Sequence, residues 1–556
     1  MDSAAARVMA TLERFFDSYY HLRPVNATFT GVHDHDDRLP DWSPDGVAAS
    51  VDEMRSIRTS LGGVAAAGSS MREVAARDRE LAISFLDVQI AEAESRHFQR
   101  GNPSLALGEA VFGVVSLITR PFAPAAQRAR SLGGRLDAIP RFLAGARRSI
   151  AGGVPEPWRA KCLHECEGAT RLLRHGVGTW LEVESLGTPA LFRACETAAA
   201  AIDEYRRWLT TYVPTAPDDR HGIESEFFGR LLTRGHHCLQ PAASLAAEAV
   251  EALGEATARL DLRAREAAPG GYPEVQARLA QAHPAVADYL PTYQQIWNDC
   301  RQACNDADLV TWPEYPIRYV PIPDQTREAA PFLYYLFYRS PAPFDHLAVH
   351  DYVVTPIDNR LPAEEQERRL RATNRSVIRL NHVVHHGAIG HHVQNYYAYR
   401  GESEIGRIAA VDCASRIGMF LGGTMAEGWA CYATDLMDEI GFLDADESLA
   451  QQHTRARLLA RAVVDLGLHG GSMTFDEAVA LYRDRVGMAP EAARGEACKN
   501  SMFPGTALMY WLGTEGLHRL RRARERAEGS SFSLRRFHDR VLSFGSIPVP
   551  LLEQIW

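Results

Sequence analysis

The sequence predicts a mostly helical fold that contains one small β-sheet. Apolar residues recur with a period near 3.6 over most of the chain, which is the pattern of helices with one buried face. Gly and Pro stand between these periodic stretches, as expected where helices end. One segment, residues 308–358, departs from the pattern and predicts the sheet. The periodic stretches are 72–98, 123–152, 187–213, 239–268, 361–386, 406–421, 425–440, 446–468 and 506–527.

Three extended runs of β-branched and aromatic residues predict the strands of this sheet: Ile317–Ile322, Phe332–Tyr338 and Leu347–Thr355. The predicted joints between helices carry paired Gly or Gly next to Pro, at 152–155, 269–271, 422–423 and 504–505. The sequence contains no internal repeat, and no long Ser/Gly/Pro linker separates the helices. We therefore expect one continuous structural unit. Within it, 1–330 forms a helical half and 331–556 carries the chemistry.

Composition excludes several classes of protein. The 556 residues are 46% hydrophobic and 23% charged, which is typical of a globular protein and not of a disordered or disulfide-scaffold chain. The net charge is −10 without a basic patch, so nucleic acid is not an expected partner. No uninterrupted apolar run is long enough to span a membrane, and Asp2, Arg7 and Glu13 interrupt the first residues as a signal peptide would not allow. We therefore expect a cytoplasmic protein.

The nine Cys residues are expected to be reduced thiols in such a compartment. Two pairs, Cys162 with Cys166 and Cys300 with Cys304, have a spacing that could hold a structural metal. We favour the simpler interpretation that they are core residues of helices, where this spacing arises by chance.

An early loop, residues 31–46, is unusually rich in His and Asp and reads GVHDHDDRLPDWSPDG. Such a cluster could belong to a functional site. The interpretation that we favour is a solvated turn whose Asp and Ser residues cap the next helix.

The densest chemistry lies at 381–400, which reads NHVVHHGAIGHHVQNYYAYR. Five imidazoles fall within eleven positions, and neutral imidazole is the commonest ligand of transition metals in proteins. A purely structural polar cluster would rarely need so many. The segment therefore predicts a metal site, and its His residues are His382, His385, His386, His391 and His392.

Spacing leaves the ligands among these His residues open. On an unbroken helix His382 shares a face with His386, and His385 shares one with His392. Glycines at 387 and 390 predict a break, which would bring other pairs together. A third ligand should come from elsewhere, and Glu427 in the first turn of a predicted amphipathic helix is the candidate. A carboxylate in the first turn could instead have no role beyond stabilising the helix, through its favourable interaction with the helix dipole.

Six segments of the chain resemble, in order, motifs of one family, the bacterial domain of unknown function 885. The family's central motifs read roughly HEAxPGHHLQ and EGWALYAE. The matching segments are GVHDHDDRLPDWSP (31–44), HHGAIGHHVQ (385–394), EGWACYAT (427–434), RAVVDLGLH (461–469), PGTALMYWLG (504–513) and FHDRVLSFGSIPVPLLE (537–553).

This resemblance implies a mostly helical fold related to the zincin proteases neurolysin and carboxypeptidase Taq, with a deep channel lined by the 1–330 half. It also implies one divalent metal, most commonly Zn, held by His385, His391 and Glu427. Of the two His residues that follow Pro-Gly in the family's motif, the family keeps the first, which corresponds to His391 here. The resemblance therefore favours His391 over His392 as the ligand. By analogy with neurolysin-like enzymes, His469 and Tyr510 would bind the oxyanion of the reaction intermediate.

The chain departs from the family at the most informative position. Zincins carry a Glu directly after the first His, and that Glu takes a proton from the metal-bound water. Here the residue is His386, and Ile389 replaces the family's Pro. An imidazole could serve as the base, or it could enter the metal shell and favour Fe, Mn or Cu over Zn.

Three classes of function follow from these observations. The first is a metal-dependent hydrolase acting on a peptide or a small amide, with ordinary peptidase activity weakened by the loss of Glu. The second is a non-hydrolytic metalloenzyme, such as a lyase, an isomerase or an oxygen-dependent enzyme. The third is a binding protein with a degenerate site. We rank the hydrolase first.

Further residues are candidates for the same site. Arg461, Asp465 and His469 are spaced four residues apart and would form one line along a helix. They could be a salt-bridged surface or part of the site, and Tyr510 could equally be a core residue. Besides the ligands, the additional candidates are His382, His392, Arg461 and Asp465.

Overall fold

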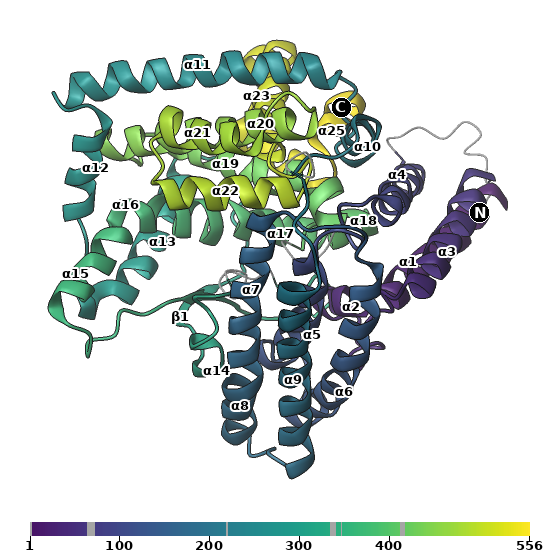
Figure 1. Cartoon of the computed structure of the whole chain (residues 1–556). Helices are drawn as coiled ribbons and strands as arrows, with labels where there is room; N and C mark the ends of the chain where they lie inside the picture. The colour runs from purple at the N-terminus through teal and green to yellow at the C-terminus, as the bar shows by residue number, and fades with distance from the viewer. Residues whose placement is uncertain (1–2, 64–72, 218–220, 334–340, 346, 412–416) are drawn as a thin grey trace. The chain divides into compact units, whose positions relative to one another are not determined.

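The computed structural model describes residues 3–63, 73–217, 221–333, 341–345, 347–411 and 417–556. The contacts between residues divide the chain into two compact units. Unit 1 comprises 1–223, 322–347 and 413–416, and unit 2 comprises 224–321, 348–412 and 417–556. Helices make up most of both units, so the predicted helical class is confirmed (Figure 1).

Unit 1 consists of helices, of which α5, α6, α7 and α9 pack against one another and α1, α3 and α4 form a second group. Its helices are α1 (Ser3–Leu22), α2 (Pro24–Thr30), α3 (Pro44–Gly63), α4 (Val74–Glu94), α5 (Pro103–Thr119), α6 (Ala125–Ser149), α7 (Glu156–Arg171), the π-helix η1 (Leu172–Gly176), α8 (Val177–Val183), α9 (Pro189–Thr211) and α14 (Asp324–Arg327).

Unit 2 carries the sheet and the predicted metal site. Its elements are α10 (Ser225–Arg230), η3 (Leu231–Gly235), α11 (Ala242–Ala267), α12 (Tyr272–Gln281), η4 (Val286–Asp288), α13 (Tyr289–Asp306), β1 (Ile317–Pro321), β2 (His350–Val354), α15 (Ala363–Ala372), α16 (Arg375–Val377), η6 (Ile378–Gly387), α17 (His391–Ala398), α18 (Glu404–Ala409), η7 (Gly418–Gly422), α19 (Gly423–Glu439), α20 (Ala445–His469), α21 (Phe475–Val486), α22 (Pro490–Met502), α23 (Met509–Glu528), η8 (Gly529–Ser531), α24 (Leu534–Ser543) and α25 (Val549–Ile555).

Two of the three predicted strands form a parallel pair. β1 and β2 align from Ile317 opposite His350 to Pro321 opposite Val354. The middle run, Phe332–Tyr338, begins in a turn at Phe332, and its residues 334–338 lie outside the described residues. The small sheet therefore comes from the first and third runs.

Most of the periodic stretches form helices close to the predicted bounds, but two do not. The stretch 361–386 is split, because the Asn374 side chain accepts a hydrogen bond from the Val377 N–H and starts a new helix there. The stretch 406–421 is wrong as one helix, since α18 ends at Ala409 and η7 begins at Gly418. The last part of this stretch continues without a break into α19.

The predicted joint at 422–423 is also wrong, because both glycines lie inside helical structure. A Cβ on Gly422 would lie 2.1 Å from the Ala409 carbonyl oxygen, and one on Gly423 would lie 2.4 Å from the Met509 sulfur. These glycines permit close packing and do not end a helix.

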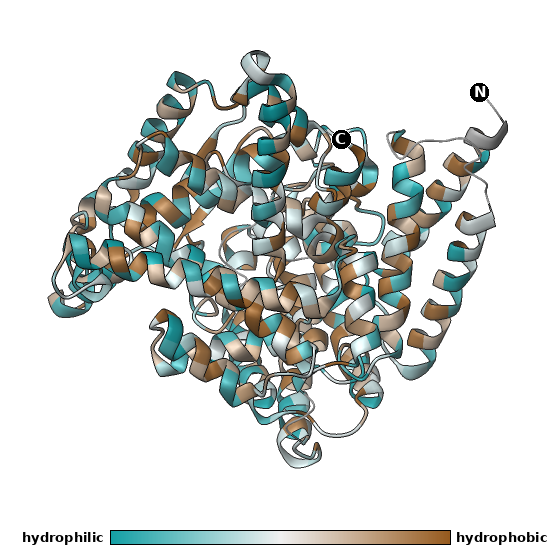
Figure 2. Cartoon of the chain, turned by 90° about the horizontal axis from the view of Figure 1, so that it is seen from above, coloured by the Kyte–Doolittle hydropathy of each residue, from teal (hydrophilic) through white to brown (hydrophobic). Residues whose placement is uncertain are grey.

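Helix α19 is the core of unit 2. Nearly every residue from Gly423 to Met437 is buried, which fits a helix whose small and apolar residues cover all of its faces. α23, α17, α20 and η6 pack around it. Helix α11, which packs along α20 and runs beside it in Figure 1, is amphipathic instead, with its buried residues on one face. Figure 2 shows the resulting alternation of hydrophilic and hydrophobic residues along the helices.

No helix among the described residues combines the length and the apolar character that crossing a membrane requires. The cysteines in the described part of the chain, which include both closely spaced pairs, are buried and form no disulfide. Cys413 lies outside the described residues.

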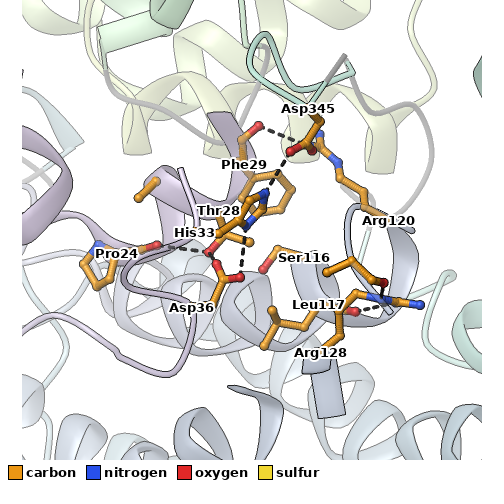
Figure 3. A network of polar contacts seen from close by, with 12 residues as sticks. Pro24, Thr28, Phe29, His33, Asp36, Ser116, Leu117, Arg120, Arg128 and Asp345 are labelled. Atoms are coloured by element: carbon orange, nitrogen blue, oxygen red, sulfur yellow. Dashed lines mark hydrogen bonds and ion pairs between the residues drawn. The ribbon is translucent and has the colours of Figure 1, made fainter. Parts of the chain in front are cut away.

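The His- and Asp-rich loop of unit 1 is only partly the solvated turn that the sequence predicts. Its second half does cap α3, since Asp41 and Ser43 accept hydrogen bonds from the backbone N–H groups of Ser43 and Gly46. In its first half Asp36 is buried, and His33 bridges two carboxylates, Asp36 at 3.0 Å and Asp345 at 2.8 Å (Figure 3).

Gly31 lets this loop approach the chain near Asp345 closely. Its φ is +93°, in the region that favours glycine, and a Cβ there would lie 2.8 Å from the Asp345 backbone nitrogen. The Phe344 N–H also donates to the Thr30 carbonyl at 3.1 Å. The loop therefore holds residues 344–345 in place.

Candidate metal centre

A tight turn in unit 2 brings the two halves of the His motif together. His385 and His386 lie just before the end of the π-helix η6 at Gly387, and His391 begins α17. Gly390 makes the reversal possible, because a Cβ there would lie 1.9 Å from the His385 carbonyl oxygen. The break that the two glycines predict is confirmed.

Two buried tryptophans hold this turn. The indole N–H of Trp297 donates to the Gly387 carbonyl at 2.7 Å, and that of Trp429 donates to the Ile389 carbonyl at 2.8 Å. Trp429 follows Glu427 by two residues in α19, so the same helix supplies a carboxylate to the cluster and a clamp to the turn.

The candidate ligand atoms converge on one point. His385 Nε2 lies 3.4 Å and His391 Nε2 lies 3.6 Å from the same carboxylate oxygen, Glu427 Oε2. These separations are at or beyond the limit of a hydrogen bond. The imidazoles of His385 and His391 stand perpendicular, with ring centroids 4.9 Å apart.

This spacing fits a bound transition metal. Zinc bonds to His nitrogen and carboxylate oxygen are about 2.0–2.2 Å long, so ligand atoms at neighbouring corners of a tetrahedron lie about 3.3–3.5 Å apart. The two measured separations to Glu427 Oε2 are 3.4 and 3.6 Å. Glu427 is also buried, and a buried carboxylate is normally paired or coordinates a metal.

His386 belongs to the same cluster. His385, His386 and His391 each offer a ligand atom, and these atoms lie within 4.8 Å of one another. The Nδ1 of His386 lies 2.7 Å from the Asn381 carbonyl oxygen and must donate to it. In the neutral ring Nε2 then carries the lone pair, as in metal-bound or proton-accepting imidazoles.

Two other histidines of the motif lie elsewhere. His382 Nδ1 lies 2.9 Å from the Tyr352 hydroxyl. His392 stacks on the ring of Tyr315, and its Nε2 lies 2.8 Å from the Tyr315 carbonyl oxygen. The structure thus brings His391, and not His392, to Glu427.

Burial and neighbouring charges act on these groups in opposite directions. Burial alone would raise the pKa of the Glu427 carboxyl, but the facing imidazoles of His391 and His385 hold that pKa well below its usual range. Burial, together with the charges of His385 and His391, holds the pKa of His386 well below its ordinary value. Burial also lowers the pKa of His382 and of His392 to about 4.

A pocket of about 470 Å³ opens beside the cluster. His385, His386 and Glu427 line it, together with residues of α12, α20, α22 and α23. Cys431, one turn beyond Glu427 on α19, also lines it, and burial raises the pKa of its thiol. The cluster is therefore open to a small ligand.

The further candidates divide between this pocket and the core. Arg461 and Tyr510 line the pocket, and the Arg461 guanidinium lies 5.2 Å from the Tyr510 ring centre. His469 is fully buried outside the pocket lining, where its Nε2 lies 3.1 Å from the Asn500 carbonyl oxygen. The structure does not bring His469 to the metal cluster.

Asp465 is fully buried as well. It accepts hydrogen bonds from the N–H groups of Gly505 at 2.9 Å and Leu508 at 3.0 Å, in the segment that leads into α23. Burial raises the pKa of this carboxyl to about 7 against the effect of those donors. Asp465 therefore positions the start of the helix that carries Tyr510.

Sequence reasoning missed most of the charged residues of the pocket. Arg455 and Arg457 on α20, Asp435 on α19 and Lys499 on α22 all line it. The helical spacing of Arg457 and Arg461 could have pointed to a shared face, but the partner helices were not visible in the sequence.

Comparisons with known proteins agree with the resemblance seen in the motifs. Residues 24–555 match the family described as "Bacterial protein of unknown function (DUF885)", so the chain belongs to this family. No curated protein matches the chain.

Solved structures share the fold. One is described as "a putative lipoprotein of unknown function" from Shewanella oneidensis, with a TM-score of 0.77 and 21% identity over 100% of both chains. Another, described as a "putative lipoprotein" from Colwellia psychrerythraea, has a TM-score of 0.75 and 15% identity over 100% of this chain and 98% of that one.

Proposed function

We propose that this member of the DUF885 family is a metal-dependent hydrolase that cleaves a peptide or amide bond in a small substrate. One observation carries the proposal: the Nε2 atoms of His385 and His391 lie 3.4 and 3.6 Å from the same buried Glu427 oxygen, and His385 and Glu427 line a pocket. That donor set is typical of catalytic metal sites with an open position.

His385, His391 and Glu427 would hold the metal, for which Zn fits best and Fe or Mn are alternatives. The metal supplies a Lewis acid that polarises a carbonyl and activates water. His386 replaces the usual Glu as proton acceptor, with its Nδ1 fixed by the Asn381 carbonyl so that Nε2 can take the proton. Tyr510, which lines the pocket, would donate a hydrogen bond to the substrate.

Several finer features are part of the same proposal. They are the kinship with the zincin proteases neurolysin and carboxypeptidase Taq, the deep channel lined by residues 1–330, and the absence of nucleic-acid and membrane partners. Cytoplasmic location stays a prediction. The lipoprotein description of the two structural neighbours makes an envelope location the alternative, and fractionation of producing cells distinguishes the two.

Metal analysis combined with an amide-hydrolysis assay tests the function. Protein purified without chelator should contain about one transition-metal ion per chain and hydrolyse members of a panel of acyl amino acids and short peptides. Glu427→Gln should lose the metal and the hydrolysis. Glu439→Gln is the matched control, because Glu439 ends the same helix and pairs with Arg521. Equal metal content in Glu427→Gln and the unaltered protein would refute the ligand assignment.

A second function is favoured by the three imidazoles, whose ligand atoms lie within 4.8 Å of one another. A three-nitrogen set suits Fe, Mn or Cu as well as Zn and would leave no base for hydrolysis. The protein would then be a non-hydrolytic metalloenzyme, such as a lyase, an isomerase or an oxygen-dependent enzyme. Bound iron, manganese or copper without amide hydrolysis, and loss of the metal in His386→Ala, would support this alternative.

A further inference from the structure

The pocket beside the metal cluster is lined by several positively charged side chains. Four cationic side chains line it: Arg455, Arg457 and Arg461 from α20, and Lys499 from α22. All of them lie in unit 2 with the cluster. Their acidic partners show which of these charges the protein itself neutralises.

Two of the three arginines have carboxylate partners. Arg455 forms ion pairs with Asp435 and Glu515. The Arg461 Nε donates to Glu496 Oε1 at 2.7 Å, and the pair is largely buried. Lys499 also acts on Glu496, since its charge helps to lower the pKa of that carboxyl.

Arg457 is the exception. Within the described part of the chain it forms no ion pair, and its Nε is buried without a hydrogen-bond partner. Burial, and next the charge of Arg461 one helical turn away, lower the pKa of Arg457. Glu496, Tyr272 and Tyr510 offset this effect only in part. A guanidinium that stays charged is therefore held where its surroundings disfavour positive charge.

A half-buried charge without a partner is costly unless an opposite charge pairs with it. The guanidinium presents planar donors that suit a carboxylate or a phosphate. Tyr272 and Tyr510 line the same pocket, and their hydroxyls would supply further hydrogen bonds to such an anion. The missing partner of Arg457 is thus best supplied by the ligand.

We propose that the pocket binds an anionic group, a carboxylate or a phosphate, at Arg457, and that the substrate is an anionic amide. Arg457 is the residue that would select it. The anion site stands on the pocket's own charges, whereas the identification of the anion as part of the substrate rests on the proposed hydrolase function.

Calorimetric binding to three probes tests the proposal, with the full chain both as purified and after EDTA treatment. The probes are N-benzoylglycine, its neutral analogue N-benzoylglycinamide, and phenyl phosphate. We expect at least one anionic probe to bind with and without EDTA, and the neutral amide to bind more weakly. Tighter binding of N-benzoylglycine indicates a carboxylate site, and tighter binding of phenyl phosphate indicates a phosphate site.

Arg457→Gln should weaken binding of the anionic probe about tenfold or more, because a charge-assisted pair is lost. The affinity of Arg457→Lys for the anionic probe should lie between those of the unaltered protein and of Arg457→Gln. Lysine keeps the charge but not the paired N–H donors of the guanidinium. Arg494→Gln removes one charge from an exposed position on α22 and should leave binding unchanged. Removal of an unpaired cation should not lower the melting temperature of Arg457→Gln, which separates lost binding from lost folding.

Three results would overturn the proposal: unchanged affinity in Arg457→Gln, equal affinity for the amide and the anions, or no binding of either anion. Binding that disappears with EDTA would assign the anion to a metal and would also count against Arg457. Binding to the EDTA-treated protein does not depend on a metal. The anion site can therefore be confirmed even if the hydrolase proposal fails.

Discussion

Gly428 and Gly513 face each other where α19 packs against α23. A Cβ on Gly428 would lie 2.5 Å from the Gly513 Cα, and one on Gly513 would lie 1.9 Å from the Thr424 carbonyl oxygen. The two backbones therefore approach as closely as only glycine allows. Because Gly428 directly follows Glu427, this contact also sets the position of the candidate ligand.

Gly513→Ala is expected to destabilise the protein by about 2–4 kcal/mol, because the added methyl group meets backbone that cannot move aside. It should also weaken metal binding, since α19 must shift with Glu427. Urea unfolding and metal analysis measure the two effects. Gly495→Ala is the control, because a Cβ at this exposed helical position meets nothing within 4 Å. Equal stability of the two variants would show that the α19–α23 contact is not close.

His386→Ala separates the two roles that remain for this residue. If His386 is the proton acceptor, the variant should keep its metal and its turnover should fall roughly 10²–10⁴-fold. As a ligand, it predicts lost metal. The hydrogen bond from Nδ1 to the Asn381 carbonyl is compatible with both, because it leaves Nε2 available. Unchanged metal content and unchanged turnover would show that His386 does neither.

Features that depend on local pattern could be predicted from the sequence. The long helices α6, α9, α11 and α20 carry apolar residues at a helical period, and their predicted bounds lie within a few residues of the observed ones. The turn at 387–390 followed from its glycines. What the sequence could not show is that the His-bearing segment before this turn is a π-helix, because ten residues do not distinguish that period from 3.6.

Features that depend on distant partners could not be predicted. His33 looked like part of a solvated turn because one of its partners, Asp345, lies 312 residues away in the sequence. Asp465 was expected either in a salt-bridged helix face or in the site, but it accepts hydrogen bonds from backbone N–H groups near the start of α23. Its carboxylate also lies 3.5 Å from His469 Nε2 on the same helix. Glu427 was a candidate third ligand from its place in the first turn of a predicted helix, and the family motif, not spacing, assigned it to the metal.

His469 and Tyr510 were paired by analogy as oxyanion donors, and their placement now predicts different effects. His469→Gln should lower stability by about 1–3 kcal/mol, because its buried hydrogen bond to the Asn500 carbonyl is lost, with turnover retained in the folded fraction. Tyr510→Phe should keep stability and lower turnover about tenfold or more, as expected for a pocket-lining donor. Loss of turnover in a fully folded His469→Gln variant would contradict this assignment.

The His33 bridge should make the stability of unit 1 depend on pH. Burial lowers the pKa of His33, but its hydrogen bonds to Asp345 and Asp36 more than offset this and raise the pKa to about 9, above the usual 6.5. A folded-state pKa above the unfolded value means that the stabilisation is complete below about pH 6.5 and is lost as the pH rises to about 9. Because the side chain is 27% exposed, we expect a loss of about 1–2 kcal/mol and not the full effect of the shift.

Urea unfolding of the unaltered protein and of His33→Gln, at pH 6 and pH 9.5, measures this loss of stability. The stability difference between the two proteins should shrink at the higher pH, whereas a constant difference would mean that the imidazole is not charged in the folded state.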